Sequence, residues 1–167
     1  MTKATSQFSL PWWVWLIALI VIAAGLFFWL QPDTSFQLIG GDKTLIVLLR
    51  EQGEAVYQLR YEGSQPAQIT NLMVMLAGTT LHTDIAEVTL LLDDQSITLQ
   101  DGAAAPPLTV QPADIVRVQV RYAARSIGYN YLYGFRVTFE QNNRTQTVDV
   151  ADPGAKDQKY NYLVDVE

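Results

Sequence analysis

The pattern of apolar and polar residues divides the chain into two parts. Residues 12–30 form one apolar run, WWVWLIALIVIAAGLFFWL, without a charged, amide or hydroxyl side chain. A helix of this length measures about 28 Å, close to the thickness of the hydrocarbon core of a bilayer. From Phe36 onward, apolar residues alternate with polar ones or form short runs between turn residues, as in β-strands. The pattern therefore predicts one transmembrane helix followed by a β domain.

Aromatic side chains gather at both ends of the apolar run. They are Trp12, Trp13 and Trp15 at its start and Phe27, Phe28 and Trp29 at its end. Aromatic rings prefer the interface between lipid and water, so the two clusters are expected to contact the two membrane surfaces. A cleaved signal peptide is the alternative. Its apolar region is usually only about 7–15 residues long, which favours an uncleaved anchor here.

The position of Lys3 favours a cytoplasmic amino terminus, because positive residues stay on the cytoplasmic side. Lys43, close to the other end of the run, nearly balances this count. We expect a single-pass signal-anchor protein of the bacterial inner membrane, with its C-terminal domain in the periplasm. The predicted order is a tail at 1–11, the helix at 12–30, a linker at 31–35 and the β domain at 36–167.

Turn residues separate the predicted strands of the β domain. The strands are expected at 36–40, 43–50, 54–62, 67–77, 85–92, 95–100, 114–123, 134–141 and 144–150, with a last one near 159–166. No helical period lies between them, which predicts an all-β, antiparallel sandwich or barrel.

Alternation within the strands assigns their two faces. Val116, Val118 and Val120 should face the core, and the residues that alternate with them, Arg117, Gln119 and Arg121, should face solvent. Two runs, Leu45–Leu49 and Leu72–Leu76, are apolar on both faces. Such strands are covered on both sides, or their second face meets another molecule.

Charge and cysteine content exclude several classes of function. The chain has 11 basic and 17 acidic residues, giving a net charge of -6. An acidic domain argues against nucleic-acid binding, which needs a basic surface. The absence of cysteine excludes disulfides, thiolate nucleophiles and Cys-ligated metal sites. One histidine and no phosphate-binding glycine loop give no support to an enzyme or to a cofactor site.

Three stretches resemble the bacterial immunoglobulin-like or fibronectin-III-like sandwiches of cell-surface and periplasmic proteins. They are Val56–Pro66 (VYQLRYEGSQP), Leu108–Val120 (LTVQPADIVRVQV) and Gly134–Val150 (GFRVTFEQNNRTQTVDV). Ala113 replaces the glycine of that family's pattern in the second stretch, and its Cys-Trp-Cys core is absent. The resemblance covers about half of the domain and implies a fold rather than a function.

Met73, Met75 and His82 are the candidate metal ligands. Two thioethers on one face of a strand and an imidazole suit Cu(I) in an extracytoplasmic domain. The alternative is that the methionines fill a gap in the core and the histidine lies in a surface loop. Asp93, Asp94 and Asp101 lack the spacing of a calcium loop, and such residues usually form turns.

Tyrosines and arginines supply the candidate contacts with a partner. Tyr129, Tyr131 and Tyr133 alternate in a predicted loop, and tyrosine is common at protein interfaces. The alternative is that they form the inward face of an edge strand.

A basic surface is the second candidate. Arg117, Arg121, Arg125 and Arg136 would lie on one outer face if strands 114–123 and 134–141 are neighbours. They would then suit an acidic partner or anionic headgroups, and the alternative is an ordinary solvated face.

These features together predict a non-catalytic accessory or assembly component. We expect it to lie in the lipid bilayer through residues 12–30 and to bind another membrane or envelope protein. A periplasmic copper-handling domain that uses Met73, Met75 and His82 is the alternative function.

Overall fold

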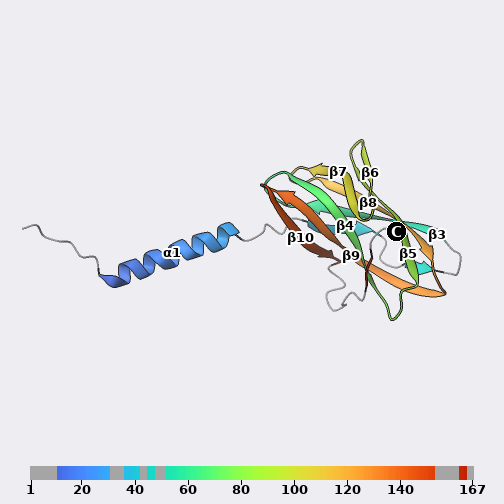
Figure 1. Cartoon of the computed structure of the whole chain (residues 1–167), viewed down its shortest axis with the longest axis horizontal. Coiled ribbons are helices and arrows are strands. Elements are labelled where there is room, and N and C mark those ends of the chain that lie inside the picture. Colours follow the sequence, from blue (N-terminus) through green and yellow to red (C-terminus); the bar gives the residue numbers. More distant parts are fainter. Residues whose placement is uncertain (1–10, 31–35, 42–44, 48–51, 153–161, 165–167) are drawn as a thin grey trace, which may run out of the picture. The chain divides into compact units, whose positions relative to one another are not determined.

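The computed structural model describes residues 11–30, 36–41, 45–47, 52–152 and 162–164 (Figure 1). The chain divides into two compact units, 1–32 and 33–167. Each unit is considered by itself below.

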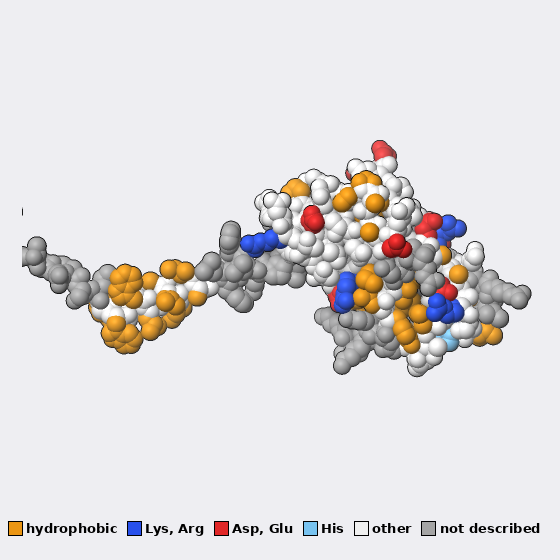
Figure 2. Space-filling view, in the orientation of Figure 1, with side chains coloured by type: hydrophobic (Ala, Val, Ile, Leu, Met, Phe, Trp, Pro, Cys, Tyr) orange, Lys and Arg blue, Asp and Glu red, His pale blue; other side chains and the backbone are white. Residues whose placement is uncertain are grey.

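The first unit contains the helix α1 (Trp12–Leu30). It begins after Pro11, whose carbonyl accepts a hydrogen bond from the Val14 N–H at 3.0 Å. Side chains of α1 are described as far as Gly25, and its large apolar ones are exposed except Val14, which is half-buried (Figure 2). Within the described part of the chain, no helix is both long and apolar enough to cross a membrane.

The second unit is built from antiparallel strands. In chain order they are β1 (Phe36–Gly41), β2 (Leu45–Val47), β3 (Gln52–Tyr61), β4 (Ala67–Ala77), β5 (Thr83–Leu92), β6 (Gln95–Thr98), β7 (Ala103–Val110), β8 (Ile115–Ala124), β9 (Gly128–Gln141), β10 (Arg144–Ala151) and β11 (Tyr162–Val164). The prediction of an all-β, antiparallel domain is confirmed.

Two sheets carry these strands. The first sheet has the order β1-β3-β8-β5-β6, and the second has the order β10-β9-β4-β11. In the second sheet, β7 and β11 both pair with the edge of β4 opposite β9, and β2 pairs with the first residues of β9, Gly128–Asn130. β9 therefore pairs with three strands.

The core lies between the two sheets, because both contribute their alternate apolar residues to one buried cluster. Val116, Val118 and Val120 of β8 are fully buried, as their alternation predicted. Rings from opposite sheets meet in this core. Tyr57 of β3 packs edge-on against Phe135 of β9, with 5.2 Å between ring centroids. The domain is thus a two-layer sandwich.

The structure corrects the predicted strands in two places, one strand boundary and one missed strand. Residues 128–133, which were predicted to form a loop, are the first half of β9. A bulge between Leu132 and Gly134 breaks the alternation there, since Met75 pairs with Gly134 but Leu76 pairs with Leu132. The strand β7 was missed because it contains Pro106 and Pro107, which are rare in central strands.

Two further predictions fall partly outside the described residues. Of the predicted strand 43–50, the backbone of Leu45–Val47 is described and forms β2. Of the predicted last strand near 159–166, Tyr162–Val164 forms β11. The remaining residues of both segments lie outside the described part.

Candidate functional site

A buried asparagine at the start of β9 holds one end of the sandwich together. The side chain of Asn130 is fully buried. Its Oδ1 accepts a hydrogen bond from the backbone N–H of His82 at 2.8 Å, and its Nδ2 donates to the carbonyl of Thr80 at 2.9 Å. Both partners lie in the connection between β4 and β5, so Asn130 ties that connection to β9.

His82 continues the same network to the connection between β8 and β9. Its carbonyl accepts the backbone N–H groups of Arg125, at 2.8 Å, and Ser126, at 3.4 Å. Its ring Nδ1 lies 2.7 Å from the Ser126 hydroxyl oxygen. Gly128, at φ 155°, lies against the imidazole ring so closely that a Cβ there would collide with the ring. The histidine thus connects two loops.

We call this end of the sandwich the cross-linked end, because hydrogen bonds of Asn130 and His82 connect its loops to β9 and to each other. Two large apolar side chains project from it. Ile127 is 71% exposed and Tyr129 is 65% exposed, more than any other large apolar residue described in the sandwich. We call these two residues the apolar tip. Beside them lies a hollow of about 240 Å³, lined by Gly78, Thr79, His82, Gly128 and Tyr129. The apolar tip is therefore exposed although the backbone beneath it is fixed by hydrogen bonds.

The three predicted contact tyrosines have different surroundings. Tyr129 is exposed, whereas Tyr131 is half-buried and its hydroxyl donates to Asp152 Oδ2 at 3.2 Å. Tyr133 is only 3% exposed and packs with Met75 and Ala77 in a second apolar cluster. Of the three, only Tyr129 has a largely exposed side chain.

The candidate metal ligands lie in separate environments. Met75 is buried in the second apolar cluster, and Met73 is half-buried two residues earlier on β4. His82 uses its Nδ1 toward Ser126 instead. Among the described residues, no group of three or more His, Cys, Asp and Glu side chains is placed to hold a metal ion.

The predicted arginine surface does not exist in the expected form. Arg117 and Arg121 lie on β8 of the first sheet, whereas Arg136 lies on β9 of the second. The prediction required these two strands to be neighbours, and they are not. Arg121 lies 3.5 Å from Glu87, and Arg125 forms an ion pair with Asp84 across β5 and the end of β8.

The residues of the cross-linked end carried little sequence signal. Asn130 and Ser126 were missed because their partners are 48 and 44 positions away in the chain. Ile127 could have been recognised as an isolated apolar residue in a polar turn.

Comparison of the chain with family models, curated proteins and solved structures finds no match.

Proposed function

We propose that the chain is a membrane-anchored, non-catalytic binding component. In this proposal residues 12–30 anchor it in the bacterial inner membrane, and an immunoglobulin-like sandwich in the periplasm binds a membrane or envelope protein. The apolar tip makes that contact.

The anchor is supported by the composition of residues 12–30, which have no polar side chain on any side. A helix that is apolar all round is normally buried in a protein core or in a membrane. The described side chains of α1 other than Val14 are exposed instead, for example Leu19 at 69% and Ile22 at 63%. Such a surface requires an apolar surrounding, and lipid provides one.

The observation that carries the binding role is the exposure of Ile127 and Tyr129 on a cross-linked backbone. Exposed aromatic and aliphatic residues are typical anchors of protein interfaces when the surface around them is fixed. Little loop ordering is then needed on binding, which favours affinity. Hydrogen bonds from Asn130 and around His82 provide this fixation.

Co-purification from membranes extracted in mild detergent tests the proposal. We compare the full chain with the double variant Ile127→Ser/Tyr129→Ser. Ile115→Ser is the matched control, because Ile115 is 41% exposed on the outer face of the first sheet. The double variant should lose the partner, and the control should retain it.

A full chain that is monomeric and brings down no stoichiometric partner would contradict the binding role. Retention of a partner by the double variant would exclude the apolar tip as its site. Extraction of the chain from membranes by alkaline carbonate would contradict the anchor.

A further inference from the structure

The edge of the second sheet ends in a long and regular strand. β10 pairs with β9 at eight consecutive positions, from Arg144 opposite Gln141 to Ala151 opposite Gly134, without a register shift. On its other side β10 has no strand partner among the described residues. Its outward N–H and C=O groups form a template on which another strand can pair.

Three other edge strands of the sandwich, β1, β6 and β7, each carry a feature that hinders pairing. β1 has a register shift between Leu38 and Gly40, and β7 contains Pro106 and Pro107. β6 is short, with four residues. Of β2 and β11, three residues each are described. Bulges, prolines and short length are the means by which proteins protect sheet edges.

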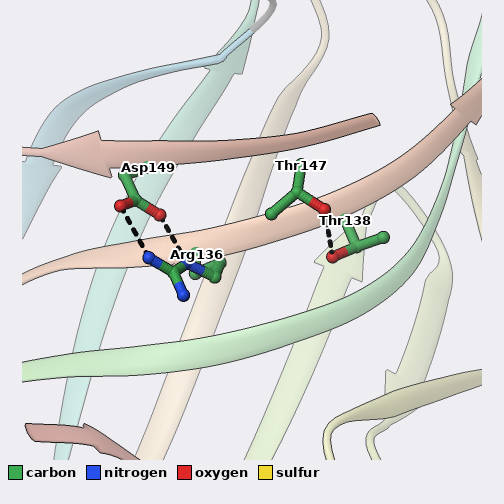
Figure 3. A network of polar contacts seen from close by, with 4 residues as sticks. All are labelled: Arg136, Thr138, Thr147 and Asp149. Atoms are coloured by element: carbon green, nitrogen blue, oxygen red, sulfur yellow. Dashed lines mark hydrogen bonds and ion pairs between the residues drawn. The ribbon is translucent and has the colours of Figure 1, made fainter. Parts of the chain in front are cut away.

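β10 has none of these features. Its sequence, RTQTVDVA, contains no proline, glycine or lysine and is rich in β-branched residues, which favour strands. Asp149 accepts two hydrogen bonds from Arg136, at 2.7 and 2.9 Å, so its charge is neutralised within the sheet (Figure 3). The hydroxyls of Thr147 and Thr138 lie 3.1 Å apart on the same face. The edge is thus long, regular and free of repelling charge.

We propose that the outer edge of β10 binds an extended strand of a partner protein, which continues the second sheet. Residues of the partner strand in line with Val148 and Val150 would be apolar, because Val150 is buried and Val148 packs against the core. Arg144, at the start of β10, forms no ion pair among the described residues. An acidic residue of the partner opposite Arg144 would provide one.

A second copy of this chain is the less favourable occupant. In a twofold antiparallel pair, the start of each β10 strand would lie beside the end of the other, so Arg144 would lie near Ala151 instead of an acidic residue. Asp149, the acidic residue of β10, is already paired with Arg136. A second copy would therefore not supply the ion pair that Arg144 lacks among the described residues.

Hydrogen exchange of the full chain in mild detergent tests the proposal with a peptide probe. The probe is a blocked peptide of alternating threonine and valine that ends in glutamate, with lysines added at its other end for solubility. We expect amides of β10 to exchange at least about fivefold more slowly with the probe, and those of β1 and β6 to be unchanged. A control peptide with proline in place of two valines should protect nothing, because it cannot pair as a strand.

A charge exchange tests the predicted register. Arg144→Glu should weaken binding of the probe by about 2- to 5-fold, the range expected from one exposed ion pair. A probe that ends in lysine should restore the binding of this variant. Arg117→Glu is the matched control, because Arg117 is also exposed and forms no ion pair among the described residues, but lies on the first sheet. This variant should bind the original probe normally.

Three results would overturn the proposal. One is a β10 whose exchange is unchanged at saturating probe, and another is equal protection of all edges. The third is a concentration-dependent dimer of the full chain in which β10 is already protected, which would identify a second copy as the occupant. All three results are distinguishable from a failure of the proposed partner contact at the apolar tip. The variant Ile127→Ser/Tyr129→Ser should leave binding of the probe to β10 unchanged.

Discussion

Asn130→Ala is the substitution that most directly tests the account of the cross-linked end. It removes the acceptor of the His82 N–H and the donor to the Thr80 carbonyl, and it leaves two backbone groups without their partners. An unpaired buried backbone group costs about 1–3 kcal/mol. Both of these bonds are partly buried, so water can replace some of the loss, and we take the low end of the range for each. The expected loss is about 2–3 kcal/mol of the free energy of unfolding.

Urea unfolding of the full chain in mild detergent measures this loss. With a slope of about 2 kcal/mol per molar urea, the midpoint should fall by about 1–1.5 M. Far-UV circular dichroism of the strands is the suitable signal, because all four tryptophans lie between residues 12 and 29 and report on the helix. Asn71→Ala is the matched control, since Asn71 is half-buried in β4 and its side chain makes no hydrogen bond among the described residues.

The control should change the free energy of unfolding by less than about 0.5 kcal/mol, the usual range away from specific contacts. A loss that small in Asn130→Ala would refute the idea that Asn130 fixes the end of the sandwich. An equal loss in both variants would show that any asparagine in these strands has the same effect, and the network would then have no special role.

Three further substitutions test the core and the backbone by the same urea midpoints. Phe135→Ala removes the ring that packs on Tyr57 and should cost about 3–5 kcal/mol; a loss under 1 kcal/mol would contradict its place in the core. Gly134→Ala should cost more than about 2 kcal/mol and loosen β10, because its Cβ would collide with the Val150 carbonyl oxygen; an unchanged midpoint would refute this close approach. Ala113→Gly should stabilise the domain by up to about 1 kcal/mol, because φ at Ala113 is 73° and a side chain is unfavourable there; destabilisation would contradict this.

The strands with clean alternation could be predicted from the sequence. Val116, Val118 and Val120 face the core because a strand buried on one face must place its apolar residues at every second position. In β9 the same rule failed at its first half. Tyr133 is the extra residue of a bulge and has no partner on β4, so the alternation before it does not continue after it. The tyrosines were therefore assigned to a loop instead of a strand.

The sheet neighbours could not be predicted, and the candidate sites depended on them. Alternation shows which face of β8 is exposed, but not that β8 lies between β3 and β5 while β9 lies in the other sheet. The arginine surface failed for this reason. Asn130 could not be recognised either, because a polar residue gains its role only when a distant loop supplies backbone groups to it.

β9 connects the two proposed binding surfaces. Its first residues carry Tyr129 and Asn130, and its second half, from Gly134, pairs with every residue of β10. The start of β9 is fixed by the hydrogen bonds of Asn130, and Gly134 allows the close approach of β10. The apolar tip and the edge of β10 are therefore both attached to one strand that is held from two sides. A partner that engages both surfaces would meet them already in place, and most of the entropy cost of ordering would be avoided.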